Sequence, residues 1–209
     1  MIQVEHAAVR EGEVTLLAET SLRAEAGDAV IVRGANGAGK STLLRLIAGM
    51  REPSRGTVSV GGRAPASPDP RFRRSLAAMI GLPPMAPDLT VRDHMLLVAA
   101  TWAESGPEAE RIAQEVLAEL GLEALATRFP HELSSGQTQL FGLALVLARP
   151  FDALVLDEPE QRLDADRIVT VIAAVRRRQA LGATVVIATH SDAIEAGLDG
   201  HTVWLREAA

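Results

Sequence analysis

Cysteine and tyrosine are both absent from this sequence, and aromatic side chains are scarce, with four phenylalanines and two tryptophans among 209 residues. A chain without cysteine can form neither a disulfide nor a thiolate-bound metal centre. Because so few aromatic rings are present, the chain offers little surface on which nucleic-acid bases could stack.

Basic side chains are outnumbered, since 21 Lys and Arg residues face 27 Asp and Glu residues and the formal net charge is −6. Affinity for a phosphate backbone comes largely from clustered basic side chains. Two clusters exist, at Arg71, Arg73 and Arg74 and at Arg176–Arg178. The first cluster stands just before an apolar strand-like run, and the second lies in a long helical pattern, where consecutive residues point to different faces. We interpret both as solvated surface and expect no nucleic-acid partner.

Long apolar runs are also missing. No stretch approaches the roughly 18 uninterrupted apolar residues of a membrane-spanning helix, and no charged-then-apolar signal segment opens the chain. The composition, 47% hydrophobic and 23% charged, is that of a globular protein with a sizeable core. These features predict a cytoplasmic protein whose length fits one compact unit with an inserted subdomain.

The first quarter of the chain is rich in strand-like runs. We predict strands at Ile2–Val9, Thr15–Ala24, Ala29–Arg33 and Thr57–Val60. A glycine-rich loop interrupts them at Gly34–Thr42 and is followed by an apolar helical pattern that Gly49 should end. We interpret the proline-rich stretch from Pro65 to Pro70 as a surface loop.

The pattern becomes helical from about Gly81 to Leu133, where Thr90 and Asp93 have the spacing of a capping box and Pro107 suits a first helical turn. After this segment, helices and apolar strands alternate. The predicted elements are a helix at Ser135–Ala148, a strand at Ala153–Leu156, a helix at Asp164–Leu181 and a strand at Thr184–Ala188. Alternation of this kind predicts a parallel sheet.

The glycine-rich loop satisfies the phosphate-loop pattern. Its residues are Gly34, Ala35, Asn36, Gly37, Ala38, Gly39, Lys40, Ser41 and Thr42. Glycines allow consecutive N–H groups to point at phosphates, and the following helix adds its positive end. Lys40 would supply charge to the β- and γ-phosphates, and Ser41 a hydroxyl ligand for magnesium.

Two adjacent acids, Asp157 and Glu158, follow the apolar strand that begins at Ala153. Ligands of open parallel sheets bind at the carboxyl ends of the strands. Asp157 is therefore a candidate magnesium ligand. Glu158 is the candidate that orients and polarises the attacking water, because phosphoryl transfer depends mainly on positioning and charge stabilisation.

A third motif stands at the start of the predicted helix, where Leu133 is followed by Ser134, Ser135, Gly136 and Gln137. Here the sequence resembles the ATPase subunits of the ABC superfamily, and most of all a transporter nucleotide-binding domain. The signature of that family, Leu-Ser-Gly-Gly-Gln, differs from this stretch only by having Gly where Ser135 stands. The resemblance extends over essentially the whole chain.

The resemblance implies further site residues and ligands. Asp164 with Leu163 looks like the family's D-loop, and His190 looks like its switch histidine, which contacts the γ-phosphate and helps to hold the attacking water. The cofactors implied are ATP and Mg²⁺. The other histidines match no motif and are interpreted as ordinary residues, at His6, His94, His131 and His201.

The predicted fold class is α/β, with a phosphate-loop (RecA-like) parallel sheet core, an N-terminal antiparallel β subdomain and a helical insertion subdomain. Residues 1–209 would form a single ABC ATPase domain, in which residues 1–82 and 134–209 make the core with its β layer. Residues 83–133 would make the helical subdomain.

Members of the family work as head-to-tail dimers, in which ATP lies between the phosphate loop of one chain and the signature of the other. The resemblance therefore implies a homodimer, or a dimer with a related ATPase subunit. It also implies a separate transmembrane permease subunit, contacted through the helical insertion beside Pro83 to Asp93, which would hold the protein at the inner face of the cell membrane.

The sequence departs from the family pattern at two positions. Pro84 stands where the family usually has a Gln that ligates magnesium and water, so that hydrolysis is expected to be slow or coupled differently. The aromatic residue that stacks on adenine is also missing before Phe72. Arg10 is a candidate replacement, because a guanidinium plane can lie against a base; the alternative is a simple surface arginine.

The leading hypothesis is the motor subunit of an importer or exporter, with a size typical of compact export subunits such as the haem exporters of cytochrome c biogenesis. A soluble ABC ATPase of the iron–sulfur assembly type shares every motif described above. A nucleotide-responsive binding module with little turnover is a third possibility, motivated by Pro84 and opposed by Glu158 and His190.

Overall fold

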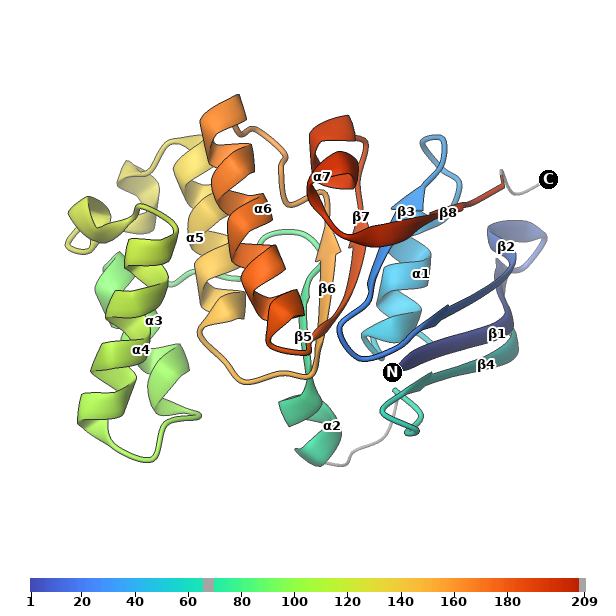
Figure 1. Cartoon of the computed structure of the whole chain (residues 1–209), viewed down its shortest axis with the longest axis horizontal. Helices are drawn as coiled ribbons and strands as arrows, with labels where there is room; N and C mark the ends of the chain where they lie inside the picture. The colour runs from blue at the N-terminus through green and yellow to red at the C-terminus, as the bar shows by residue number, and fades with distance from the viewer. Residues whose placement is uncertain (66–69, 207–209) are drawn as a thin grey trace.

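The computed structural model describes residues 1–65 and 70–206, and two sheets organise them (Figure 1). The antiparallel sheet has the order β2-β1-β4 and consists of β1 (Ile2–Glu11), β2 (Val14–Ala24) and β4 (Arg55–Val60). The parallel sheet has the order β5-β6-β7-β3-β8 and consists of β3 (Ala29–Arg33), β5 (Leu76–Met79), β6 (Ala153–Asp157), β7 (Thr184–Ala188) and β8 (Gly200–Trp204). The expected α/β fold, with a parallel core beside an antiparallel N-terminal layer, is confirmed.

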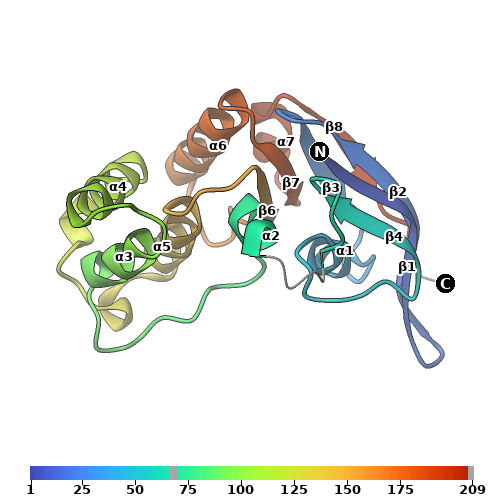
Figure 2. The same cartoon turned by 90° about the horizontal axis from the view of Figure 1, so that it is seen from below.

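The longer helices form two groups. The first group lies outside the insertion and consists of α1 (Lys40–Ile47), α5 (Ser135–Leu147) and α6 (Ala165–Ala180). The insertion holds α3 (Val91–Ala100), α4 (Gly106–Glu119) and the 3₁₀ turns η1 (Glu123–Leu125) and η2 (Pro130–Glu132). Figure 2 shows α3 and α4 beside α5, at the end of the molecule opposite to the antiparallel sheet.

The three inner strands of the parallel sheet, β3, β6 and β7, are almost entirely apolar because both of their faces are covered. Alternate residues of β3 enter different cores: Ile31 packs with residues of α3, α4, α5 and α6, whereas Val30 packs with α1 and the antiparallel sheet. Both side chains are buried. Burial on both faces explains why these strands lack the polar alternation of a half-exposed strand.

Side-chain caps fix the start of both insertion helices. The Thr90 hydroxyl accepts a hydrogen bond from the Asp93 amide at 3.2 Å, and the Asp93 carboxylate accepts one from the Thr90 amide at 3.0 Å. This confirms the predicted capping box, and Pro107 lies in the first turn of α4 after the Ser105 cap, as expected. An ion pair between Arg92 of α3 and Glu110 of α4 joins the two helices, with one Arg92 guanidinium nitrogen donating to both Glu110 carboxylate oxygens at 2.8 and 2.9 Å.

The insertion should be the part of the protein most sensitive to acid. Hydrogen bonds from Thr90 lower the pKa of Asp93, the Arg92 guanidinium lowers the pKa of Glu110, and the Phe129 amide followed by Arg128 lowers the pKa of Glu132. Each of these carboxyl groups has a lower pKa in the folded state than in the unfolded state, where it is about 4. Such a group stabilises the fold fully at pH values above the unfolded-state pKa. This stabilisation is lost as the pH falls through the folded-state pKa.

We therefore expect the insertion to loosen before the sheet as the pH falls from about 5 toward 3. Trp102, just after α3, reports on the insertion once Trp204 is replaced by Phe. In that variant, Trp102 fluorescence should change at a higher pH than the far-ultraviolet circular dichroism. Coincident transitions, or the reverse order, would contradict the prediction.

Three short elements were not foreseen from the sequence: α2 (Pro70–Ser75), α7 (Asp192–Gly197) and β8. The helices have six residues each, too few to reveal a helical period, and β8 is an edge strand whose residues are mostly exposed. Of the proline-rich stretch predicted as a loop, residues 66–69 lie outside the described residues. Pro70 belongs to α2 instead.

One of the two arginine clusters is not simply solvated surface. Arg71, Arg73 and Arg74 are exposed, as are Arg176 and Arg177. Arg178, in contrast, has only 14% of its side chain exposed and forms an ion pair with Glu119 at the end of α4. The interpretation of Arg178 as solvated was wrong, because α6 packs this side of its last turns toward the insertion.

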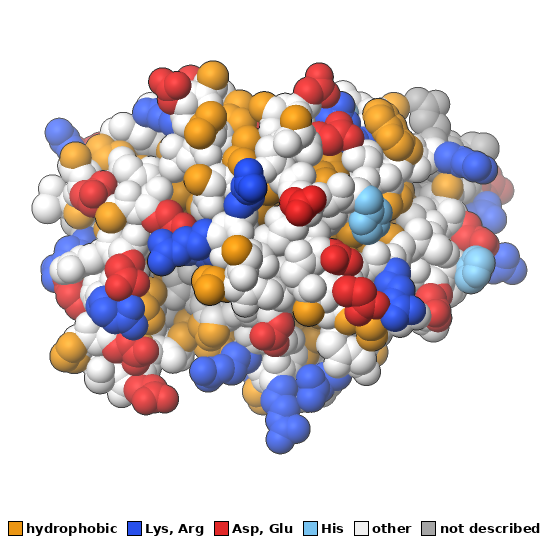
Figure 3. All heavy atoms as spheres, viewed as in Figure 1, with side chains coloured by type: hydrophobic (Ala, Val, Ile, Leu, Met, Phe, Trp, Pro, Cys, Tyr) orange, Lys and Arg blue, Asp and Glu red, His pale blue; other side chains and the backbone are white. Residues whose placement is uncertain are grey.

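The face seen in Figure 3 carries acidic and basic side chains intermingled. Among residues 1–65 and 70–206, no helix has both the length and the apolar character that crossing a bilayer requires.

Candidate nucleotide-binding site

The phosphate loop connects β3 to α1 and is held together by its own lysine. The Lys40 ammonium group donates hydrogen bonds to the carbonyl oxygens of Gly34 at 2.9 Å and Ala35 at 3.1 Å. Lys40 is only 7% exposed. Its charge therefore lies inside the loop, where it faces the same space as the N–H groups of the loop.

Glycine at position 39 is required by both conformation and space. Its φ of +94° lies in the left-handed region, and a Cβ added there would lie 2.6 Å from the carbonyl oxygen of Leu16 in β2. Any side chain would thus push the loop away from the antiparallel sheet. The close approach fixes the loop on β2 and sets the direction in which α1 begins.

The N-terminus of α1 has no side-chain cap, because its N-cap residue is Gly39. Every other α-helix with a described cap begins with a capping side chain, at Thr90, Ser105, Ser134, Asp164 and Ser191. The first N–H groups of a helix without such a cap remain available to an external acceptor, and the helix dipole favours an anion there. The start of α1 is therefore built to bind an anionic group such as phosphate.

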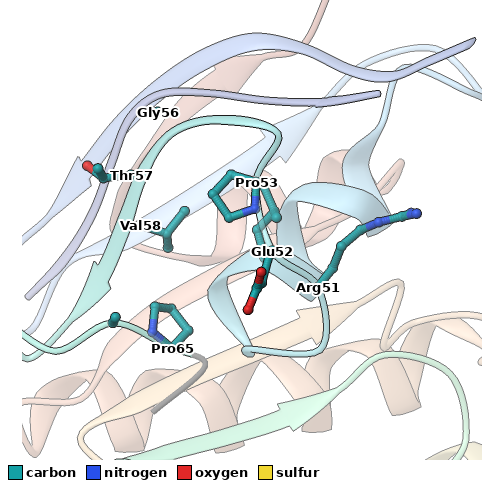
Figure 4. A pocket seen from close by; sticks show the side chains of 9 residues that line it. Arg51, Glu52, Pro53, Gly56, Thr57, Val58 and Pro65 are labelled. Carbon is teal, nitrogen blue, oxygen red and sulfur yellow. The ribbon is translucent and has the colours of Figure 1, made fainter. Parts of the chain in front are cut away.

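A cavity of about 460 Å³ opens at this loop. It is lined by Val14, Thr15, Leu16, Asn36, Gly37, Gly39, Lys40, Ser41, Thr42 and Glu158. The structure thus brings most of the predicted phosphate loop together with the predicted water-orienting acid, although they lie more than 100 residues apart in the sequence. A separate cavity of about 290 Å³ beneath β4, shown in Figure 4, contains no residue of the phosphate loop.

The acid pair stands at the carboxyl end of β6, as expected. Glu158 has a φ of +46°, so the chain turns sharply directly after the strand. The turn is held by a hydrogen bond from the Glu158 amide to the carbonyl oxygen of Ala188 at 2.8 Å. The Gln139 side chain, buried in α5, donates to the carbonyl oxygens of Glu158 at 3.1 Å and Pro159 at 3.3 Å.

The predicted switch histidine lies next to this turn. The Nε2 atom of His190 is 3.6 Å from the Glu158 Oε1 atom, with 48% of the His190 side chain and 34% of the Glu158 side chain exposed. The two candidate catalytic side chains therefore face the same partly open region. Glu158 lines the cavity at the loop, whereas His190 is not among the cavity residues and is connected to it through Glu158.

The signature segment forms the start of α5. Ser134 and Gln137 make a reciprocal capping box, in which the Ser134 amide donates to Gln137 at 2.8 Å and the Gln137 amide donates to the Ser134 hydroxyl at 3.3 Å. A Cβ at Gly136 would lie 2.9 Å from the carbonyl oxygen of Arg162, so glycine allows the start of α5 to approach the loop before α6. Asp164 caps α6 by accepting from the Arg167 amide at 2.9 Å.

None of the signature residues, and not Asp164, is among the residues lining the cavity at the phosphate loop. The chain therefore carries two separate parts of the predicted ATP site. Ser135 and Gly136 lie at the N-terminus of α5, whose first turn contains no acidic side chain.

The residues present fit a magnesium ion. A hydroxyl oxygen from Ser41 and a carboxylate oxygen from Asp157 are hard donors of the kind that Mg²⁺ prefers, and this ion usually keeps several water ligands. Within the described residues, no group of three or more acids and histidines is arranged as a self-sufficient metal site. The donor set is thus suited to an ion that arrives with phosphate oxygens and water.

The two positions that depart from the family pattern lie differently with respect to the cavity. Pro84 is exposed in the irregular segment before α3, where the Ala86 amide donates to the buried His94 ring at 2.9 Å. Arg10 pairs with Thr15 across the β1–β2 hairpin and is exposed, and it is not among the cavity residues. Val14 and Leu16, which belong to no motif, line the cavity instead.

The phosphate-loop strand β3, followed by an uncapped helix, and the strand β6, which ends in two acids and lies in the same parallel sheet with β7 between them, define a nucleotide-binding domain of an α/β NTPase. A family profile described as "ABC transporter" matches residues 17–161. The chain belongs to the ABC transporter family and is an ATP-binding cassette of its ATPase class.

Individual relatives agree with this assignment. The trehalose/maltose import ATP-binding protein MalK of Thermococcus litoralis is 36% identical over 191 residues, covering 88% of this chain and 51% of that protein. The cytochrome c biogenesis ATP-binding export protein CcmA of Rhodospirillum rubrum is 35% identical over 182 residues, covering 87% of this chain and 76% of that protein. The chain thus spans about half the length of MalK.

Among solved structures, the dimeric post-hydrolysis state of the ATP-binding cassette MJ0796 bound to ADP and Pi superposes with a TM-score of 0.87. The sequence identity is 25%, and the match covers 99% of this chain and 95% of that one.

Proposed function

We propose that this chain binds and hydrolyses ATP as the motor subunit of an ABC transporter. The observation that carries the proposal is the cavity that Glu158 shares with the phosphate loop, together with His190, whose Nε2 atom lies 3.6 Å from the Glu158 Oε1 atom. The relatives named above include both an import and an export protein. They support the motor function and leave the direction of transport open.

In this proposal the loop binds the triphosphate. The backbone N–H groups of residues 34–42 point at the phosphates, and Lys40 supplies a positive charge to the β- and γ-phosphates. Ser41 and Asp157 hold Mg²⁺, which when bound neutralises charge on the phosphate oxygens.

Glu158 and His190 act on the attacking water. The Glu158 carboxylate accepts a hydrogen bond from the water and orients one oxygen lone pair toward the γ-phosphate, and it can receive the proton as the bond forms. His190 lies close enough to share this water or to donate to a γ-phosphate oxygen. Because Pro84 offers no side-chain ligand, turnover should be slow unless a partner completes the site.

We further propose that the complete site forms between two chains arranged head to tail. Ser134, Ser135, Gly136 and Gln137 are not among the residues that line the cavity of their own chain, which supports a role at the ATP bound by an opposing subunit. Their helix N-terminus would face the γ-phosphate across the interface, with Asp164 beside it. The dimeric state of the related cassette supports this arrangement.

Nucleotide binding can be tested directly through Lys40, because it is the only lysine in the sequence. An amine-reactive reagent then has one side-chain target besides the N-terminus. ATP with magnesium should protect Lys40 from labelling, as measured by peptide mass spectrometry, while the N-terminus serves as the internal control. Labelling that is unchanged by millimolar ATP would refute binding at this loop.

Hydrolysis is tested by phosphate release from the purified chain with magnesium, compared with a Lys40→Ala variant. We expect steady turnover from the unmodified chain and a loss of ATP affinity of at least about 30-fold in the variant, corresponding to about 2 kcal/mol for removing one partner of a buried charge pair. Tight binding without turnover would favour the binding-module function.

The proposed docking surface for the permease is a hollow of about 400 Å³ between the core and the insertion. It is lined by Ala48, Met50, Phe72, Arg73, Leu76, Ala78, Thr101, Trp102 and Arg149. The Arg149 guanidinium lies 4.7 Å from the centre of the Trp102 ring, and burial lowers the pKa of Arg149. This hollow lies at one end of α3, and the segment Pro83 to Asp93, through which the resemblance implies docking, lies at the other end and stays part of the proposed contact.

Replacing Trp102 with Ala should weaken docking by about 10-fold or more, since aromatic anchors dominate interface energies. The measurement is co-purification of the cassette with its permease in detergent. Leu181→Ala, at a side chain that is 80% exposed and outside the hollow, is the matched control. Equal retention of both variants on the permease would argue against this surface.

Base recognition is expected to be weak, because the cavity presents Val14 and Leu16 and no aromatic ring. Apolar contact with a base does not distinguish adenine from guanine by hydrogen bonds. We therefore expect ATP and GTP to bind with affinities within about 10-fold of each other, or 1.4 kcal/mol. Competition by GTP in the Lys40 protection experiment measures this, and Arg10→Ala should leave the ratio unchanged.

A further inference from the structure

Glu160 lies two residues after Glu158, in the loop between β6 and α6. Its Oε1 atom accepts a hydrogen bond from the Thr189 hydroxyl group. Its Oε2 atom is buried and has no hydrogen-bond partner within residues 1–65 and 70–206. Glu160 therefore connects the loop that carries Glu158 with the loop that carries His190.

Thr189 is a fully buried residue that immediately precedes His190. Its amide donates to the carbonyl oxygen of Val32 at 3.3 Å, and its hydroxyl oxygen accepts from the Ser191 amide at 2.8 Å. The same hydroxyl donates to Glu160. The residues on both sides of His190 are thus fixed through one side chain, whose orientation depends on Glu160.

The Glu158 turn is anchored independently of Thr189. The Glu158 amide bonds to Ala188 at 2.8 Å, and Gln139 donates to the carbonyl oxygens of Glu158 and Pro159. The bond from the Glu158 amide to Ala188 joins the Glu158 turn to the end of β7, and the contact between Glu160 and Thr189 is a second link, one residue closer to His190. This side-chain link helps to set the separation of Glu158 and His190.

A carboxylate is a costly choice for this position. Accepting one hydrogen bond from a threonine requires only a neutral acceptor, yet here a charged group is partly buried with one oxygen unpaired. Unsatisfied buried polar atoms are rare in folded proteins and often mark a functional constraint. The contact is therefore better explained by the geometry it imposes than by stability.

We propose that Glu160 is a positioning residue that, through Thr189, holds His190 in place beside Glu158. The proposal rests on the proposed function, in which these two side chains act on the water and γ-phosphate. It assigns no contact between Glu160 and the nucleotide. Breaking the contact between Glu160 and Thr189 should therefore lower the rate of hydrolysis and leave ATP binding at the phosphate loop unchanged.

The test compares two pairs of variants in phosphate release with magnesium and ATP. Glu160→Ala and Thr189→Val both break the contact, and each should lower kcat about 10-fold with KM changed less than about 2-fold. Glu160→Gln and Thr189→Ser keep an acceptor and a hydroxyl, respectively, and should restore most of kcat. The double variant Glu160→Ala with Thr189→Val should be no slower than the slower single variant, since the effects of substituting two residues in contact do not add.

A second readout does not depend on hydrolysis. The Ser191 amide is bonded to the Thr189 hydroxyl, so its hydrogen exchange should speed up in Glu160→Ala and stay slow in Glu160→Gln. The matched control is Thr57→Val, which removes another threonine–glutamate bond, from Thr57 in β4 to Glu5 in β1 at 3.3 Å, in the antiparallel sheet away from both loops. It should change neither the exchange at Ser191 nor kcat.

The outcomes separate this proposal from the proposed function. If the unmodified chain releases no phosphate but Ser191 exchange follows the predicted order, the positioning contact stands and the hydrolytic function fails. If the unmodified chain hydrolyses ATP while kcat and Ser191 exchange in Glu160→Ala match the unmodified chain, the positioning role of Glu160 is overturned.

Discussion

Glu158→Gln should lower the rate of ATP hydrolysis by about 100-fold or more while ATP still binds. The amide of Gln can accept a hydrogen bond from water but cannot receive its proton, and a positioned acid–base group contributes about 10² to 10⁴ in rate. Glutamine has nearly the same shape as glutamate, so the turn with φ of +46° and the bonds from Gln139 should persist. The loss then reports on the chemistry and not on the fold.

The same variant should also accumulate as an ATP-bound dimer. In the proposed head-to-tail dimer the two ATP molecules lie between the subunits, so a variant that binds ATP without hydrolysing it should keep the interface closed. Light scattering with ATP should show a doubled mass for Glu158→Gln and a monomer for Lys40→Ala. A dimer of equal abundance with and without ATP would contradict an ATP-driven association, and unchanged hydrolysis would remove Glu158 from the mechanism.

Phe141→Ala should cause the largest loss of stability, about 3 to 5 kcal/mol, which is the usual range for removing a buried phenylalanine. Phe141 is completely buried in α5 and belongs to the core shared by the sheet and the insertion. Its ring meets the edge of the buried His94 ring at a centroid distance of 5.5 Å. Such a loss is a large fraction of the 5 to 15 kcal/mol that typically stabilises a domain.

Urea unfolding measures this effect. Leu181→Ala serves as the control, because Leu181 is 80% exposed and should change the free energy of unfolding by less than about 0.5 kcal/mol. A loss below about 1 kcal/mol for Phe141→Ala would mean that the core between α5 and the insertion is loosely packed. That result would be inconsistent with the burial of both rings.

Much of the fold could be predicted because its signals are local. The apolar runs gave β3 and β7 with their observed bounds, and the spacing of Thr90 and Asp93 gave the start of α3. The elements that were not foreseen lacked such signals. The edge strand β8 has little burial of its own, and its position beside β3 is set by pairing of Val32 with Val203 far along the chain.

The candidate site shows the same division. The phosphate loop, the acid pair and the signature could be located from sequence because each is a short contiguous motif. The roles given to their side chains remain predictions. Gln139 could not be located in this way, because its contact with Glu158 depends on how α5 packs against the loop after β6.

The sequence alone determined that this chain is an ABC-type cassette, since the residues that define the class lie within short stretches where backbone conformation and chemistry are coupled. Only the tertiary structure decided which distant side chains meet. It buried Arg178 against Glu119, lined the cavity with Val14 and Leu16, and joined Glu160 to Thr189 across 29 residues. The physical reason is that such contacts depend on the packing of whole elements, which no local pattern encodes.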